Sequence, residues 1–271
     1  FYFGFIEKRY SLKSRLIMPK KIFISGASSG IGESLAYYYA QRQATIGIAA
    51  RRLTQLESVA RKCKELGGNP IIYHLDVSDQ EKSKTAAQEF IAKTGGIDIV
   101  IANAGIGGED NIISVDSSAI NEILKINILG VTNIVVPFLP AMEKQKSGKI
   151  GIISSIASFR GLPDHGGYSS SKAALRYLAE SWDHNLSKND ITITTIFPGW
   201  IATEMTAKHE YKMAFLMDSD KAAIIIAEAS LSYLGVGINP PTPSWGKMLA
   251  EAGEQLYPLW WFVAAPGVAI T

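Results

Sequence analysis

The chain contains little cysteine or histidine, and its charges nearly balance. Its 271 residues include one cysteine, Cys63, which excludes an internal disulfide and favours a reducing compartment. One cysteine and four scattered histidines do not make a metal-ligand cluster, so we expect no metal site. The formal net charge of +2 gives no reason to expect nucleic acid as a partner.

Long apolar runs are missing as well. Residues 256–271 carry no charge, but they include two prolines and are shorter than the ~20 residues that span a bilayer. The chain is nevertheless 47% hydrophobic, enough for a sizeable core, and its length suggests one α/β domain or two units. We therefore expect a cytoplasmic protein.

Short apolar runs alternate with helical patterns along most of the chain. This order predicts an α/β fold with a doubly wound, Rossmann-like parallel sheet of six strands. Ligands bind beyond the carboxyl ends of the strands in such sheets. The expected strands are Lys21–Ser25, Ala44–Ala50, Pro70–Leu75, Ile97–Ala102, Lys149–Ile153 and Ile191–Phe197. The expected helices are Glu33–Gln41, Leu53–Leu66, Asp79–Thr94, Val115–Gly130 and Tyr168–Ser187.

A glycine-rich loop joins the first expected strand to the first helix. Its glycines, Gly26, Gly30 and Gly32, are spaced G-x3-G-x-G rather than G-x-G-x-x-G. Glycine permits positive φ and close backbone approach, and the N–H groups at a helix start bind anions. We interpret the loop as a pyrophosphate site for a dinucleotide. The alternative is a purely structural turn.

Two arginines, Arg51 and Arg52, end the second expected strand. In a dinucleotide fold, an acidic residue here binds the ribose 2′-hydroxyl, whereas an arginine accommodates a 2′-phosphate. Residues 49–52 include no Asp or Glu, so NADP(H) is favoured over NAD(H). The alternative is that both arginines are solvated charges at the start of a helix.

Tyr168 and Lys172 lie four residues apart, which places their side chains on one face of a helix. A neighbouring cation lowers the pKa of a phenol from its usual value of about 10. Ser154 and Ser155 close the preceding strand, where a hydroxyl would reach the same point. Together these groups would polarise a carbonyl and exchange a proton with its oxygen. By itself, Y-x-x-x-K is also an ordinary pair on a helix surface.

Several motifs occur together in one order. They are SGASSGIG at 25–32, NAG at 103–105, Asn127, Ser155, YSSSK at 168–172 and PGWIAT at 198–203. With these motifs, residues of about 18–223 resemble the short-chain dehydrogenase/reductase family. The resemblance implies an oxidoreductase that transfers a hydride between NADP(H) and a carbonyl or alcohol substrate.

The resemblance also implies four catalytic residues: Asn127, Ser155, Tyr168 and Lys172. Ser155 would polarise the carbonyl, and Tyr168 would be the general acid/base. Lys172 would bind the nicotinamide ribose and lower the pKa of Tyr168. Asn127 would hold a water that links Lys172 to solvent, which explains a polar residue inside an expected helix.

The implied cofactor contacts lie along the whole dinucleotide. Five line the pyrophosphate: Gly26, Ser28, Ser29, Gly30 and Ile31. Others hold the 2′-phosphate or flank the adenine: Arg51, Arg52, Asp76 and Val77. The remainder lie near the fourth strand and the nicotinamide end: Asn103, Ala104, Gly105, Tyr168, Lys172, Pro198, Gly199 and Thr203.

The resemblance further implies a small-molecule substrate and a homodimer or homotetramer. We expect pocket residues at four positions, Phe159, His165, Trp200 and Met205, which suggests an apolar carbonyl compound. Ordinary packing is the alternative reading of each of these residues.

The two ends of the chain do not fit this pattern. Residues 1–17 precede Met18 and are expected to be an N-terminal extension. From about residue 226, with AEASLSYLGVGINPPTPSWGKML, the chain resembles the inner-membrane permease subunit of dipeptide/oligopeptide ABC importers. We therefore expect a dehydrogenase domain at 18–223 and a chimeric C-terminus at 224–271, from gene fusion or an assembly artefact. This tail would allow membrane association.

The unusual C-terminus leaves two other functions open. One is a chimera that binds the cofactor but is inactive. The other is a membrane transport-associated fragment.

Overall fold

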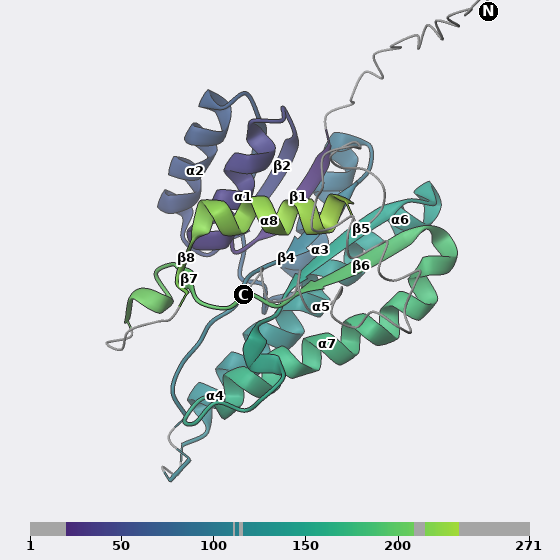
Figure 1. Cartoon of the computed structure of the whole chain (residues 1–271). Helices are drawn as coiled ribbons and strands as arrows, with labels where there is room; N and C mark the ends of the chain where they lie inside the picture. The colour runs from purple at the N-terminus through teal and green to yellow at the C-terminus, as the bar shows by residue number, and fades with distance from the viewer. Residues whose placement is uncertain (1–19, 111, 114–115, 209–214, 233–271) are drawn as a thin grey trace, which may run out of the picture.

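The computed structural model describes residues 20–110, 112–113, 116–208 and 215–232. Within these ranges, six parallel strands form one sheet in the order β3-β2-β1-β4-β5-β6 (Figure 1). This confirms the predicted Rossmann-like fold, with strand ends within two residues of those expected. The strands are β1 (Lys21–Ser25), β2 (Thr45–Ala50), β3 (Asn69–His74), β4 (Ile99–Ala102), β5 (Gly148–Ile153) and β6 (Ile191–Ile196).

Helices cover both faces of the sheet. One apolar cluster joins the sheet to α1 (Gly30–Ala40), α2 (Leu53–Glu65) and α8 (Ser219–Ser232). The opposite cluster includes α3 (Gln80–Thr94), α5 (Gly130–Val135) and α7 (Gly166–Leu186). Within β1, Ile22 and Ile24 belong to the first cluster and Phe23 to the second. Burial on both faces explains why the central strands β1, β2, β4 and β5 read as mostly apolar runs.

The helix expected at Val115–Gly130 extends further than predicted. It begins at Ser118 and continues as α4 (Ser118–Leu124), π-helical η1 (Lys125–Leu129), α5, η2 (Val136–Phe138) and α6 (Leu139–Gln145). Gly130 does not end the helix. It is a glycine because it packs closely against Val77, where a Cβ would stand 2.6 Å from Val77 Cγ2. The prediction was wrong because this contact joins segments that are distant in the sequence.

The run from Ser118 to Gln145 is the one described helix long and apolar enough to cross a membrane. It packs on the sheet in this structure, where Val131, Ile134 and Val135 are buried. Its apolar composition therefore fits a core position.

Helix α8 crosses residue 223, the predicted end of the dehydrogenase domain. Ile226 and Ala227 are buried in the same cluster as α1, and the Tyr38 hydroxyl donates a 3.2 Å hydrogen bond to the Glu228 carboxylate. The predicted boundary thus falls inside a packed helix. The N-terminal extension 1–17 and residues 233–271 of the permease-like stretch lie outside the described residues.

The remaining short elements connect the larger ones. Two parallel strands, β7 (Ile201–Ala202) and β8 (Met217–Asp218), form a separate two-stranded sheet. The single-turn helices are η3 (Ile156–Ser158), η4 (Ser187–Asn189) and η5 (Thr206–Lys208).

Candidate active site

The glycine loop between β1 and α1 lies tightly against two other segments. Gly26 has φ +69°, and a Cβ on it would stand 2.7 Å from Ala104 Cα. Gly30 has φ +58°, and its Cβ would stand 2.9 Å from Thr203 Cγ2. No side chain caps α1 at Ser29. The loop therefore brings an uncapped helix start to the carboxyl edge of the sheet, which is an arrangement suited to an anion.

Ser25 and Asn103 tie this loop to the segment after β4. The Asn103 amide Nδ2 donates to the backbone oxygens of Ser25 and Gly26 at 3.1 and 3.2 Å. In return, the Ser25 hydroxyl accepts from the backbone N–H groups of Asn103 and Ala104. Ser25 was not among the predicted site residues, although a polar residue closing an apolar strand is a readable signal.

Tyr168, Ser155 and Lys172 come together at the ends of β5 and α7. Ser155 is the second residue after β5 and precedes η3, and Tyr168 lies in the first turn of α7, where a hydrogen bond joins the two side chains. The Lys172 ammonium donates to the Ile153 carbonyl at 2.9 Å and lies 5.7 Å from the Tyr168 ring centroid. Ser154 faces away from this group, because its hydroxyl donates to the Lys172 carbonyl at 2.8 Å.

Burial dominates the electrostatics of this group. It raises the pKa of Tyr168, and the hydrogen bond with Ser155 opposes that shift. Burial also lowers the pKa of Lys172 to about 8. We expected Lys172 to lower the pKa of Tyr168. In the protein without a cofactor, the pKa of Tyr168 is raised instead. The reason is the burial of the phenol, and the Lys172 ammonium is directed to a backbone carbonyl rather than to the phenol oxygen.

Asn127 is fully buried in the π-helical turn η1. Its Oδ1 accepts from Ile106 N at 2.8 Å, and its Nδ2 donates to Ile106 O and to the Ser171 hydroxyl. A Cβ on Gly105 would stand 3.1 Å from Asn127 Oδ1 and 3.4 Å from Lys172 Nζ. Asn127 therefore fastens the loop after β4 to α7, and its Oδ1 and the Lys172 ammonium both lie beside Gly105.

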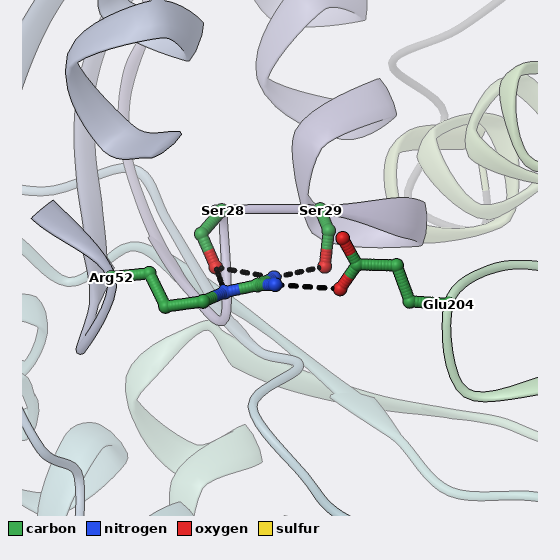
Figure 2. A network of polar contacts seen from close by, with 4 residues as sticks. All are labelled: Ser28, Ser29, Arg52 and Glu204. Carbon is green, nitrogen blue, oxygen red and sulfur yellow. Dashed lines mark hydrogen bonds and ion pairs between the residues drawn. The ribbon is translucent and has the colours of Figure 1, made fainter. Parts of the chain in front are cut away.

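The two arginines take different positions. Arg51 is exposed and lies 3.9 Å from the Asp76 carboxylate. Arg52 instead lies along the glycine loop, where its guanidinium donates to the hydroxyls of Ser28 and Ser29 and to Glu204 (Figure 2). Glu204 was missed at the sequence level, because it lies 152 residues from Arg52 and no local pattern indicates the contact.

The other expected cofactor residues line the same edge. The Pro198 carbonyl accepts from Ile156 N at 3.1 Å, and Gly199 leads from there towards β7. Ile31 is partly buried against the core below the glycine loop. The Val77 side chain is buried against Gly130, so an adenine contact there would involve its backbone.

The expected pocket residues do not gather in one place. Met205 and Tyr168 both approach Gly107. Phe159 contributes to a groove of about 350 Å³, whose lining includes Phe197 and Arg176 but neither Ser155 nor Tyr168. His165 immediately precedes α7, with its Nδ1 2.9 Å from the Pro163 carbonyl oxygen. The Trp200 carbonyl accepts from Met217 N, which joins β7 to β8.

A buried carboxylate also supports α7 close to Tyr168. Asp110 Oδ2 accepts from the backbone N–H of Gly167 at 2.7 Å. Negative charge at a helix start is stabilising. Asp110 was not predicted, because it lies in a loop remote from α7 in the sequence.

Comparisons with known proteins agree on one family. Residues 20–214 match the family model described as short chain dehydrogenase. An uncharacterized oxidoreductase of Myxococcus xanthus is 34% identical over 78% of this chain and 85% of the relative. The 11-beta-hydroxysteroid dehydrogenase-like 3 of Arabidopsis thaliana is 36% identical over 89% of this chain and 79% of the relative. The crystal structure of a short-chain type dehydrogenase/reductase from Mycobacterium marinum superposes with a TM-score of 0.73 at 25% identity, covering 78% of this chain and 88% of that one.

Proposed function

This chain belongs to the short-chain dehydrogenase/reductase family, and we propose that it transfers a hydride between NADP(H) and a small carbonyl or alcohol compound. One observation carries the proposal: the hydroxyls of Ser155 and Tyr168 meet beside the buried Lys172. They do so at the sheet edge where the glycine loop lies.

The residues at this edge fit a dinucleotide. The close approach of Gly26 and Gly30 to neighbouring segments leaves a smooth backbone surface at the start of α1. When bound, the nicotinamide supplies or accepts the hydride. The residues that would hold the cofactor are those predicted: the loop residues, Arg51, Arg52, Asp76, the backbone of Val77, Asn103–Gly105, Tyr168, Lys172, Pro198, Gly199 and Thr203.

The chain's own groups would manage the proton. In the reducing direction, Tyr168 donates its hydroxyl proton to the substrate oxygen while Ser155 donates a hydrogen bond to the same atom. The raised pKa of Tyr168 keeps the hydroxyl protonated near neutral pH, which is the form that reduction needs. Lys172 would hold the nicotinamide ribose, and its charge would stabilise the phenolate that forms. Asn127 would hold a water close to Lys172 and so connect it to solvent.

The preference for NADP(H) rests on the two arginines. Replacing Arg51 and Arg52 separately by aspartate should identify which one contacts the 2′-phosphate, because each change removes one positive charge and adds one negative charge. The variant that lacks the contact should lose kcat/KM with NADPH relative to NADH. If both ratios equal that of the parent, the preference for NADP(H) is wrong.

Assembly, location and the C-terminal tail remain proposals that follow from the resemblances. We propose a cytoplasmic homodimer or homotetramer, with the permease-like residues forming a tail that permits membrane association. The two alternative functions, an inactive chimera and a transport-associated fragment, draw no support from the described residues. Both predict no turnover.

A substrate screen tests the proposed function. Purified full-length chain is incubated with NADPH and a panel of ketones and aldehydes, and NADPH absorbance is followed. Tyr168→Phe should lower turnover by about 10²–10⁴-fold while NADPH binding is retained, because only the acid/base group is lost. Tyr177→Phe is the matched control, since Tyr177 is an exposed tyrosine of the same helix. Equal turnover in both variants would remove Tyr168 from the mechanism.

A further inference from the structure

The guanidinium of Arg52 is held by two kinds of partner. Its Nε and NH2 donate to the Ser28 hydroxyl at 3.2 and 3.1 Å, and NH2 also donates to the Ser29 hydroxyl at 2.6 Å. Its NH1 donates to Glu204 Oε2 at 2.7 Å. Figure 2 shows the guanidinium lying between the two serines and Glu204. Arg52 therefore binds the glycine loop through Nε and NH2, and it binds a carboxylate distant in the sequence through NH1.

This donor set matches a phosphate as well as a carboxylate. Arginine presents several N–H donors in a planar fork, which fits either anion, and serine hydroxyls donate as readily as they accept. Glu204 is the anion on Arg52 in the protein alone. A second anion at the same guanidinium would repel Glu204 and would need the same NH1 donor.

We propose, on the basis of the proposed function, that Glu204 sets cofactor specificity by competing with the ribose 2′-phosphate for Arg52. When no cofactor is present, the Glu204 carboxylate pairs with the Arg52 guanidinium. When NADP(H) binds, its 2′-phosphate replaces Glu204 on the guanidinium. A cofactor without this phosphate leaves the Arg52–Glu204 ion pair intact. The carboxylate thus reduces the affinity for NADPH and leaves the affinity for NADH unaffected.

The position of Glu204 connects this exchange to the substrate side. Its neighbour Thr203 packs against Gly30 of the glycine loop, and its other neighbour Met205 lies with Tyr168 around Gly107. Glu204 therefore belongs to a segment that touches both the cofactor loop and the space beside Tyr168. Recognition of the 2′-phosphate is thereby linked to the segment next to the reacting groups.

The expected effect is modest, because both side chains are partly exposed, at 40% and 63%. An exposed ion pair of this kind changes an equilibrium by about two- to fivefold. Glu204→Gln keeps the size of the side chain and removes its charge, so NADPH should bind about two- to fivefold more tightly. The dissociation constant for NADH should stay the same.

The experiment is a titration of the full chain with NADPH and with NADH, followed by calorimetry or by cofactor fluorescence. The matched control is Glu65→Gln, which makes the same charge change on an exposed residue at the far end of α2. That end is about 18 Å from the start of the helix, beyond the Debye length at physiological salt. A double variant, Arg52→Gln with Glu204→Gln, should bind NADPH no more tightly than Arg52→Gln alone.

The outcomes separate this inference from the proposed function. If the parent binds NADPH but Glu204→Gln binds it with the same dissociation constant, the competition is refuted and the proposed function stands. The inference is refuted if Glu204→Gln tightens the binding of NADPH and NADH equally, or if Glu65→Gln tightens NADPH binding by the same factor. Either result would mean that the change in affinity comes from the overall charge of the protein. If the parent binds neither dinucleotide, the proposed function fails and the competition with it.

Discussion

Replacing Ile226 by alanine tests whether α8 is part of the dehydrogenase core. The question arises because the stretch that resembles a permease begins at about residue 226, inside this helix. Ile226 is 3% exposed and packs in the cluster that contains α1. A buried Ile→Ala change costs about 2–5 kcal/mol, from lost apolar burial and from the cavity left behind. One kcal/mol shifts the midpoint of thermal unfolding by about 2–4 °C for a domain of this size. We therefore expect Ile226→Ala to lower Tm by about 4–20 °C.

Ile224→Ala is the matched control in the same helix. Ile224 is 50% exposed, so its replacement should change Tm by only a degree or two. The gain in helix propensity from alanine is the same in both variants and cancels in the comparison. Thermal unfolding of the full chain is followed by circular dichroism. Equal Tm values for the two variants would show that α8 does not contribute to the core, and the boundary predicted at residue 223 would stand.

Three further predictions follow from single residues. Because burial lowers the pKa of Lys172 to about 8, the unfolded state binds more protons than the folded state between that value and the usual 10.5. Stability should therefore rise by about 2 kcal/mol between pH 8 and 10 relative to Lys172→Met, as measured by urea unfolding. Gly26→Ala should abolish NADPH binding and lower Tm, because the new Cβ clashes with the backbone and the positive φ adds strain. Gly67→Ala is the control, since Gly67 has φ +92° and nothing within 4 Å of a Cβ, so this variant adds the strain of positive φ without a clash. Asp110→Ala should cost about 1 kcal/mol by leaving the Gly167 N–H without its acceptor, and Asp110→Asn should restore most of it in the same unfolding assay.

Features set by neighbouring residues were readable from the sequence. The strand Lys21–Ser25 and the glycine loop after it follow from an apolar run and from glycine spacing within a dozen residues. Tyr168 and Lys172 share a helix, so their proximity follows from helical geometry alone. The parallel order of the strands follows from their alternation with helices.

Features set by contacts between distant segments were not readable. Gly130 looks like the end of a helix until its contact with Val77 is known. The Arg52–Glu204 pair joins residues that no local pattern relates. The pKa of Tyr168 was predicted in the wrong direction, because burial depends on the whole fold and the Lys172 ammonium is directed to the Ile153 carbonyl. Sequence patterns therefore predicted which side chains lie close together better than they predicted their pKa values.

Transfer of an isotopic label tests the central claim most directly. The full chain is incubated with a ketone identified in the screen and with NADPH that carries deuterium at both C4 positions of the nicotinamide ring, and the alcohol product is analysed by mass spectrometry. The account predicts one deuterium on the carbinol carbon, with formation slowed by about 10²–10⁴-fold in Tyr168→Phe. NADPH binding without label in any product, or equal labelling rates in the parent and in Tyr168→Phe, would contradict it.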